Sequence, residues 1–189
     1  MRVLISISET KGIVSFLKNL TGFYSEIEII ATSGTYKYLK NNDIHSTEIS
    51  DYIDFPEILD GRVKSLHPKI FGGILSKKNS KKHNIDLKKF NINKIDMVIC
   101  NLYKFEKVIN SNEFSNEDAI ENIDIGGASI LRAAAKNYND VVVISDPSDY
   151  EFVFNCILEN KLNYDIKKKL AAKVFNLSLI HISEPTRLS

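Results

Sequence analysis

The amino-acid sequence predicts an α/β layered fold with a mainly parallel sheet flanked by helices. Short apolar runs alternate along the chain with segments of helical apolar periodicity. That alternation is typical of buried strands connected by helices that cover the sheet. A chain of 189 residues is long enough to bury one such core, so we predict a single domain.

Five apolar runs are predicted to form the strands. In chain order they are Val3–Ile7, Glu28–Thr32, Ser46–Ile49, Ile95–Leu102 and Val141–Ser145. The run Ile95–Leu102 is the clearest buried strand, because apolar residues dominate it with little alternation. Sheets of this kind bind ligands beyond the carboxyl ends of their strands. We therefore expect the functional residues to follow these runs directly.

Helical periodicity marks the segments between the strands. The predicted helices are Ile13–Leu20, Tyr36–Lys40, Glu117–Ile123, Ala128–Lys136, Pro147–Asn160 and Ile166–Leu177. Ser115 and Asp118 can form a capping box, and Pro147 after Asp146 is a favourable helix start. The segment Asn79–Asn93 is rich in Lys and Asn and is predicted to be a mobile connection.

The end of the chain departs from this pattern. An amphipathic helix is predicted up to Leu177, but Leu179–Ser189 (LIHISEPTRLS) interrupts its periodicity. We predict a domain over residues 1–178 and an extension foreign to it over residues 179–189. His181 is accordingly given no functional role.

Composition excludes several classes of protein. Hydrophobic residues make up 43% and charged residues 26%, and the formal net charge is +1, so neither nucleic acid nor an anionic membrane is an expected partner. No segment approaches the ~20 apolar residues of a membrane span. Cys100 and Cys156 form no CxxC or Cys/His cluster, which argues against a disulfide framework or a zinc site. We expect a cytoplasmic protein without a metal.

Hydroxyl-bearing side chains gather after the first two predicted strands. They are Ser6, Ser8 and Thr10 after the first strand, and Thr32, Ser33 and Thr35, with Gly34 between them, after the second. Each group leads into a predicted helix, whose unpaired N–H groups and dipole favour a phosphate. Neither loop matches a Walker motif or GxGxxG. Each loop alone could be an ordinary helix cap, and that alternative stays as open as phosphate binding.

A basic segment bounded by glycine and proline runs from Gly61 to Pro68. The planar guanidinium of Arg62 can form two parallel hydrogen bonds to a carboxamide or a phosphate. Lys64 offers a compact positive charge, or an acid whose pKa depends on its surroundings. A solvated basic loop is the alternative explanation. His67 is predicted to be structural, because no second metal ligand lies at a usable spacing.

Polar residues also end the most apolar strand. Asn101 can hydrogen-bond an amide edge, and Tyr103 can donate to developing negative charge. Cys100 is predicted to pack as a small apolar side chain instead of acting as a nucleophile.

The segment Asp124–Gly127 leads into the predicted helix that ends at Lys136. Gly126 and Gly127 would permit a close backbone approach. A lysine at a helix C-terminus is often there only to pair with the helix dipole. Asp124 and Lys136 can meet in one pocket only if the glycine-containing turn reverses the chain.

Five motifs together resemble a known enzyme family. They are SISETKG (6–12), ATSGTYK (31–37), GRVKSLHPKIFGGIL (61–75), CNLYKF (100–105) and IDIGGASILRAAAKN (123–137). In order and spacing they are similar to the N-terminal domain of the bifunctional aminoimidazole-carboxamide-ribonucleotide (AICAR) transformylase/inosine-monophosphate (IMP) cyclohydrolase family. The resemblance covers residues 1 to about 177.

This resemblance implies a fold like that of methylglyoxal synthase and a dehydrative ring closure. The substrate would be the purine precursor formyl-AICAR (FAICAR), the product would be IMP, and the enzyme would be a cyclic amidine hydrolase that needs no cofactor or metal. Such chemistry requires oxyanion stabilisation and proton transfer.

The resemblance also assigns roles to individual residues. Lys136 would transfer protons with Asp124 as its charged partner, and Lys64 and Tyr103 would stabilise the oxyanion. The assigned substrate-binding residues are Arg62, Ser65 and Asn101 for the base, the backbone glycines Gly126 and Gly127, and Ser8, Thr10, Lys11, Thr32, Ser33, Gly34 and Thr35 for the ribose phosphate. Which catalytic group is the acid at each step stays open.

Some features depart from the family pattern. Thr10 stands where relatives commonly have a lysine, so either Thr10 or Lys11 would contact the phosphate. The transformylase domain is absent from these 189 residues, and formyl transfer is not expected. A regulatory binding module of the same fold and a methylglyoxal-synthase-like lyase stay as alternatives, and a homodimer stays open.

Overall fold

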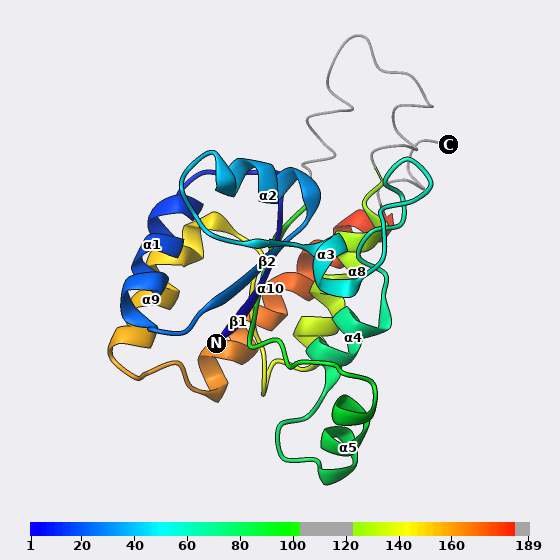
Figure 1. Cartoon of the computed structure of the whole chain (residues 1–189). Coiled ribbons are helices and arrows are strands. Elements are labelled where there is room, and N and C mark those ends of the chain that lie inside the picture. Colours follow the sequence, from blue (N-terminus) through cyan, green and yellow to red (C-terminus); the bar gives the residue numbers. More distant parts are fainter. Residues whose placement is uncertain (103–122, 184–189) are drawn as a thin grey trace.

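A five-stranded parallel sheet forms the centre of the protein (Figure 1). The computed structural model describes the backbone of residues 1–102 and 123–183, and the side chains of residues 1–102 and 123–177. The strands are β1 (Arg2–Ile7), β2 (Glu28–Ala31), β3 (Thr47–Glu48), β4 (Met97–Asn101) and β5 (Val142–Ile144). Their order across the sheet is β3-β2-β1-β4-β5, so the chain leaves β1 on one side and later returns on the other.

Helices cover both faces of this sheet (Figure 1). On one face α1 (Ile13–Phe23) packs beside α9 (Tyr150–Leu158), and on the other α8 (Ile125–Lys136) packs between α4 (Pro68–Leu75) and α10 (Tyr164–Ser183). The other described helices are α2 (Ser33–Lys40), α3 (Ile49–Ile53), α5 (Lys81–Lys89) and the 3₁₀ turn η1 (Pro147–Asp149). The predicted α/β layered fold with a mainly parallel sheet is confirmed.

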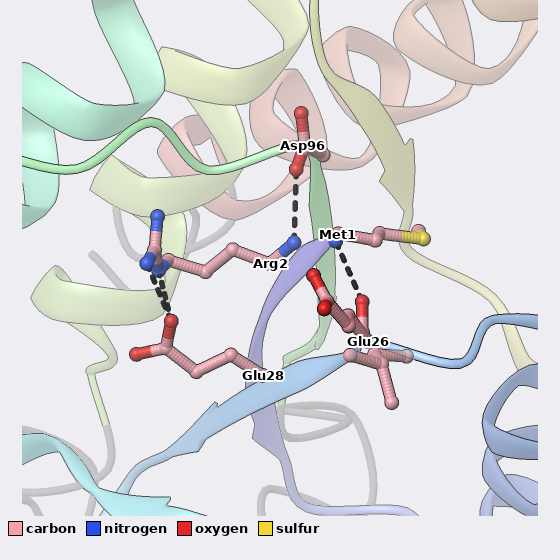
Figure 2. A pocket seen from close by; sticks show the side chains of 6 residues that line it. Met1, Arg2, Glu26, Glu28 and Asp96 are labelled. Carbon is pink, nitrogen blue, oxygen red and sulfur yellow. Dashed lines mark hydrogen bonds and ion pairs between the residues drawn. The ribbon is translucent and has the colours of Figure 1, made fainter.

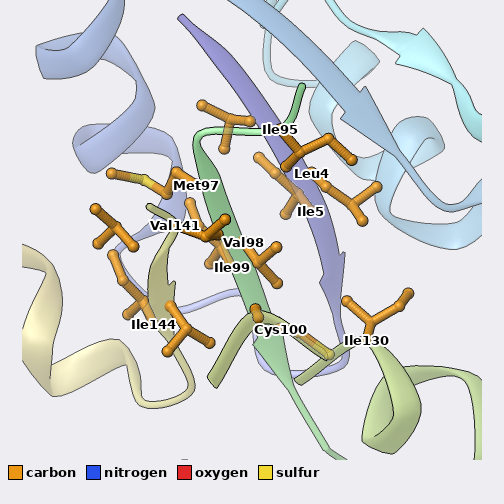
Figure 3. Packing of buried hydrophobic residues seen from close by; sticks show 14 of the residues in the cluster. Leu4, Ile5, Ile95, Met97, Val98, Ile99, Cys100, Ile130, Val141 and Ile144 are labelled. Atoms are coloured by element: carbon orange, nitrogen blue, oxygen red, sulfur yellow. The ribbon is translucent and has the colours of Figure 1, made fainter. Parts of the chain in front are cut away.

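The apolar core lies between the sheet and its helices (Figure 3). All five residues of β4 are buried, which explains why its sequence is apolar without alternation. Val98 and Cys100 lie in this cluster with Ile130 of α8. Cys100 is buried as a small apolar side chain, as predicted. Every predicted strand is present: β1 begins one residue before the predicted Val3, and the other four strands are shorter than predicted.

Several helices differ from their predicted extents. The structure begins α2 at Ser33 and α8 at Ile125, each three residues before the predicted start. Polar and glycine residues occupy most of these first turns. Helical periodicity is recognised from apolar positions, so the sequence did not indicate where the two helices begin. The backbone of α10 continues to Ser183, six residues beyond the predicted Leu177. The domain boundary at residue 178 stays a prediction.

The predicted mobile connection Asn79–Asn93 is wrong, because it contains α5. Ser80 caps this helix by accepting a hydrogen bond from the His83 N–H at 3.2 Å, and Leu87 is its one buried residue. A helix with one buried apolar residue shows almost no apolar periodicity in its sequence, so the Lys- and Asn-rich composition of this segment indicated a loop. Residues 117–122 of another predicted helix, with its Ser115 capping box, lie outside the described residues.

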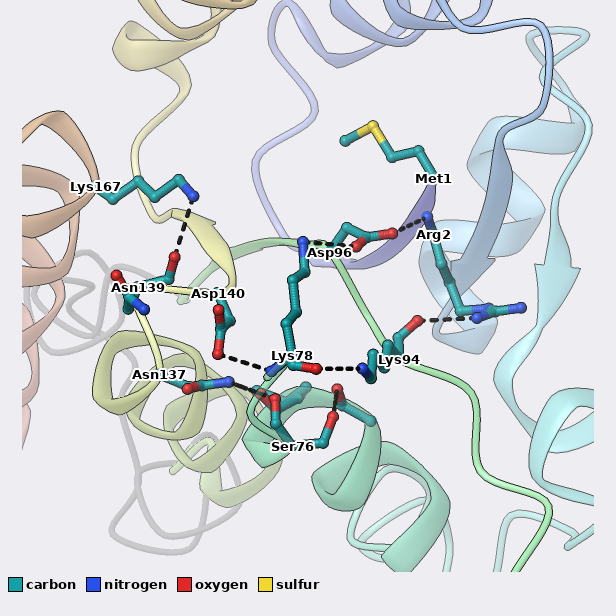
Figure 4. Close-up of polar contacts among 12 residues, drawn as sticks. Met1, Arg2, Ser76, Lys78, Lys94, Asp96, Asn137, Asn139, Asp140 and Lys167 are labelled. Carbon is teal, nitrogen blue, oxygen red and sulfur yellow. Dashed lines mark hydrogen bonds and ion pairs between the residues drawn. The ribbon is translucent and has the colours of Figure 1, made fainter. Parts of the chain in front are cut away.

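Ion pairs and hydrogen bonds close the edge of the sheet where the strands begin. Figure 2 shows a shallow pocket there, in which the Arg2 side chain contacts Glu28 (Nε to Oε2, 2.7 Å) and the Arg2 N–H donates to Asp96 (2.9 Å). Figure 4 continues this network to the end of α8, where the Asn137 side chain donates to the carbonyls of Ile74 (2.7 Å) and Ser76 (3.1 Å). The polar groups of this edge are used in holding elements together.

Candidate functional site

A cavity of about 690 Å³ opens at the carboxyl ends of β1, β2 and β4. Strand β1 has β2 on one side and β4 on the other, so the order of the strands reverses direction at this point. Parallel sheets bind ligands where the strand order reverses in this way. The described residues that line it are Ser6, Ile7, Ser8, Thr32, Gly34, Thr35, Asp60, Gly61, Arg62, Lys64, Ser65, Asn101, Ile123, Asp124, Ile125, Gly126 and Gly127. Each of the five sequence motifs therefore contributes residues to one site.

Asn101 fixes the loop after β1 from the end of the neighbouring strand β4. Its side-chain oxygen accepts from the N–H groups of Ser8 (2.7 Å) and Glu9 (2.9 Å) and from the Ser8 hydroxyl (3.1 Å). Its amide nitrogen donates to the Glu9 carbonyl at 2.8 Å. The sequence suggested that Asn101 orients the base of a substrate. In the structure its amide holds the β1–α1 loop and Asn101 lines the cavity, so it shapes the cavity wall, and its contact with the base stays a prediction.

Buried hydroxyls fix the end of β1 against the start of α2. Thr35 Oγ1 accepts from the Ile7 N–H at 3.0 Å. Thr32 Oγ1 lies 3.2 Å from Ser6 Oγ and 3.3 Å from Thr35 Oγ1. Thr32 and Thr35 are 7% and 2% exposed. These two threonines therefore act mainly by setting the position of the first turn of α2.

Gly34 leaves open space at that first turn. Gly34 lines the cavity. A Cβ at this position would have no heavy atom within 4 Å among the described residues, apart from its chain neighbours and the backbone of its own helix. Its φ is not positive, so the backbone conformation does not require glycine. The first N–H groups of a helix have no intrahelical acceptor and attract anions. The space beside Gly34 is suited to a ligand phosphate.

A tight turn presents the basic segment to the same cavity. Leu59, Asp60 and Gly61 have positive φ angles of 55°, 52° and 87°, and the flanking Ile58 and Val63 form an antiparallel bridge. Arg62 and Lys64 follow this turn directly, and both line the cavity. The basic segment is thus part of a pocket and not a remote solvated loop.

The glycines after Asp124 allow close packing at the start of α8. Asp124 caps the helix by accepting from the Gly127 N–H at 2.7 Å. A Cβ on Gly127 would overlap the Asp124 carboxylate, and one on Gly126 would lie 2.7 Å from Ser65 Oγ. The predicted close backbone approach at both glycines is therefore present, and it holds Asp124 and Ser65 in the cavity wall.

The predicted arrangement of Lys136 beside Asp124 is absent from the structure. The glycine segment does not reverse the chain but forms the first turn of a continuous 12-residue helix. At 1.5 Å per residue, Asp124 and Lys136 are separated by about 18 Å along α8. Asn137, the next residue, belongs to the polar network at the opposite edge of the sheet (Figure 4). Lys136 is exposed there and does not line the cavity.

Other predicted residues also differ from expectation. Thr10 and Lys11 are not among the described residues that line the cavity, and the Ser33 hydroxyl donates to Glu57. Tyr103 lies outside the described residues. The sequence analysis missed Asp60, Ile123 and Ile125 as lining residues and Glu57 as a contact of the site. Ile123 and Ile125 lie within the last motif but were given no role. Glu57 and Asp60 lie outside all five motifs, although the Asp60–Gly61 pair is a turn signal.

Two ionisable groups beside the site are held neutral. Burial, together with the nearby Asp124 carboxylate, raises the pKa of Cys100, whose Sγ lies 3.7 Å from the Gly127 carbonyl. This thiol is therefore not a thiolate nucleophile. Burial and the nearby Lys69 ammonium lower the pKa of His67, whose Nδ1 accepts from the Lys69 N–H at 3.2 Å. Neutral His67 thus caps α4 and ends the basic segment.

Metal binding and membrane crossing find no support in the described part of the chain. No cluster of three or more His, Cys, Asp or Glu side chains there has a geometry that could hold a metal ion. None of the helices in that part is both long and apolar enough to cross a lipid bilayer.

Comparison with known proteins identifies relatives along nearly the whole chain. The family model of the MGS-like domain matches residues 12–129, and that of the AICARFT/IMPCHase bienzyme matches residues 134–180. The chain is 50% identical over 177 residues to the bifunctional purine biosynthesis protein PurH of Clostridium perfringens (strain SM101) and 46% identical over 175 residues to that of Bacillus subtilis (strain 168). These matches confirm the resemblance that the five motifs indicate.

The coverage of these relatives is uneven. The two alignments include 93% and 92% of this chain but 35% and 34% of the relatives, so the chain spans about a third of their length. The crystal structure of ForH is similar over 100% of this chain and 96% of its own, with a TM-score of 0.84 and 27% sequence identity.

The cap at His67 predicts a pH dependence of stability. The folded-state pKa is lower than the unfolded value near 6.5, so the unfolded chain binds more protons as the pH falls, and acid favours unfolding. The stability contributed by neutral His67 is complete above pH ~6.5 and is lost as the pH falls through the lowered pKa. His67→Asn keeps a capping acceptor that does not titrate.

Melting curves of His67→Asn should therefore lose less stability than wild type between pH 7.5 and pH 5. His45→Asn, which removes an exposed imidazole, should keep the wild-type dependence. Equal pH dependence of wild type and His67→Asn would contradict this role.

Proposed function

We propose that this chain, which belongs to the MGS-like domain family, is an IMP cyclohydrolase that closes the ring of FAICAR to give IMP. One observation carries the proposal: the cavity at the carboxyl ends of β1, β2 and β4 gathers the open first turn of α2, the cations Arg62 and Lys64, and the Asp124 carboxylate. The names of the relatives, which describe bifunctional purine biosynthesis proteins, support the same reaction class.

The reaction forms one C–N bond and expels one molecule of water. The carboxamide nitrogen attacks the formyl carbon and loses a proton, while the formyl oxygen becomes an oxyanion and takes up a proton. The formamide nitrogen then loses its proton and forms a C=N bond, and the hydroxyl oxygen takes up a second proton and departs as water, which completes the ring. A base close to the nitrogen and a cation close to the oxyanion are sufficient for this sequence.

Asp124 and Lys64 are the groups we assign to these steps. Both line the cavity and come from different elements: Asp124 caps α8, and Lys64 follows the turn at residues 59–61. In our proposal the Asp124 carboxylate accepts a proton from the carboxamide nitrogen, and the Lys64 ammonium stabilises the oxyanion. Ser65 and Arg62, beside them in the wall, bind and orient the base. Tyr103 is kept as a proposed oxyanion donor from the sequence resemblance alone.

Phosphate binding is assigned to the first turn of α2. Gly34 faces open space there, and Thr32 and Thr35 hold the turn against β1. Ser8 lines the cavity from the neighbouring loop. This places the phosphate and the ring-closing groups on different walls, which leaves the ribose to span between them.

We further propose a cytoplasmic location, because both Cys100 and Cys156 are buried free thiols. Formyl transfer, the other reaction of the bifunctional family, is not proposed for these residues. A purine nucleotide is the expected small-molecule ligand, and the association of two copies is left to experiment.

The phosphate assignment predicts how ligands and Gly34 affect melting. IMP at 100 times its Kd should stabilise the wild type by about 2.7 kcal/mol, and inosine at the same concentration far less. Gly34→Ala should not destabilise the free protein, because alanine favours a helix by about 0.5–1 kcal/mol, but its methyl group would project into the phosphate space.

The IMP-induced rise in Tm should therefore be largely lost in Gly34→Ala. Gly22→Ala is the matched control, because Gly22 also lies in a helix with open space around it, in α1. It should keep the full IMP effect. Equal stabilisation of wild type by inosine and IMP would remove the phosphate from the assignment.

The catalytic assignment predicts different results for two lysines. Lys64→Met should reduce ring closure by roughly 10²–10³-fold, the range for loss of one oxyanion-stabilising group. Lys136→Met should leave turnover within a few-fold of wild type, because Lys136 lies at the far end of α8. The increase in absorbance on conversion of FAICAR to IMP measures both rates.

Melting temperatures of both variants serve as the control for folding. A large loss of turnover in Lys136→Met, with its melting temperature unchanged, would restore the role that the sequence resemblance implies. Binding of IMP without any ring closure by the wild type would favour a regulatory binding module.

A further inference from the structure

We infer that Glu57 is a positioning residue, whose carboxylate holds Lys64 at the cavity by linking the turn segment to the first turn of α2. This inference rests on the function proposed above. Glu57 itself is not among the described residues that line the cavity. It lines a neighbouring hollow that it shares with Ser33, so we place its action on Lys64 and not on the substrate.

The two carboxylate oxygens of Glu57 contact two different parts of the site. Oε2 accepts a hydrogen bond from Ser33 Oγ at 2.7 Å, and Oε1 lies 3.6 Å from Lys64 Nζ. Ser33 is the first residue of α2, where we place the phosphate, and Lys64 is the proposed oxyanion-stabilising group. One side chain thus connects the phosphate-binding wall to the catalytic wall.

Gly61 makes room for this connection. Its φ of 87° is a conformation that L side chains rarely adopt, and a Cβ at this position would overlap Glu57 Oε1. The same Cβ would lie 3.7 Å from Lys64 Nζ. A glycine at the turn therefore lets the carboxylate approach the backbone and stay within reach of the ammonium.

The exposure of the pair argues that its role is positional. The side chains of Lys64 and Glu57 are 40% and 32% exposed, and ion pairs this accessible to water contribute little to stability. Small displacements of a catalytic group reduce turnover strongly, since the reacting groups must keep a near-attack geometry. Loss of Glu57 should therefore affect the rate far more than the melting temperature.

Glu57→Gln separates the two contacts, because its amide oxygen can still accept from Ser33 while the charge attraction to Lys64 is lost. Asp51→Asn is the matched control: it removes one negative charge from the same hollow without touching Lys64. Trace labelling with acetic anhydride, analysed by mass spectrometry of the peptide that contains Lys64, reports the accessibility of the amine without any assay of activity. Labelling of Lys64 should rise several-fold in Glu57→Gln and stay at the wild-type level in Asp51→Asn.

The kinetic experiment tests whether this contact serves ring closure. Glu57→Gln should lower kcat on the order of tenfold and leave KM for FAICAR and the melting temperature close to wild type. In a Lys64→Met background the same substitution should cause no further loss, because residues that act through one contact are not additive.

Three results would overturn the inference. They are unchanged labelling of Lys64 in Glu57→Gln, an equal loss of kcat in the Lys64→Met background, and a fall in melting temperature that accounts for the loss of activity. If the wild type closes no ring, the proposed function fails. The labelling result then decides alone whether Glu57 holds Lys64.

Discussion

The hydrogen bonds of Asn101 to the loop after β1 are the constraint on which the site depends. In a parallel sheet with β1 between β2 and β4, the chain leaves β1 toward one side and returns on the other, so a crevice opens between the ends of β1 and β4. Asn101 crosses that crevice and uses its amide on both the N–H and carbonyl groups of the loop. These bonds set the position of Ser8 and Glu9 at the cavity wall.

The two edges of the sheet have different uses for their polar groups. At the amino edge, Arg2, Asp96 and Asn137 are paired with carboxylates, N–H groups or carbonyls of neighbouring elements. At the carboxyl edge, helix α2 begins with its first turn facing open space at Gly34. Because α8 connects the two edges, its N-terminal Asp124 lines the cavity, whereas Lys136 lies exposed at its other end, beside Asn137 of the amino-edge network. This division is the basis for assigning catalysis to Lys64.

The sequence was sufficient for the fold class and for the segments that meet at the cavity, because buried parallel strands have an unmistakable apolar composition and their ends mark the site. It failed where the signal was not local. Helix α5 buries only Leu87, so no periodicity shows it. The role of Asn101 depends on a loop 92 residues away, and the contact of Glu57 with Ser33 spans 24 residues. Motif membership likewise gave Lys136 a role without giving the direction of its helix.

The central claim is that a purine nucleotide binds at the carboxyl edge, with its phosphate at α2 and its base between Lys64 and Asp124. A crystal structure of the chain with IMP tests this most directly. The account predicts phosphate density beside Gly34 and the six-membered ring of the base facing Lys64 and Asp124. Nucleotide density at the amino edge near Lys136, with the cavity empty, would contradict it.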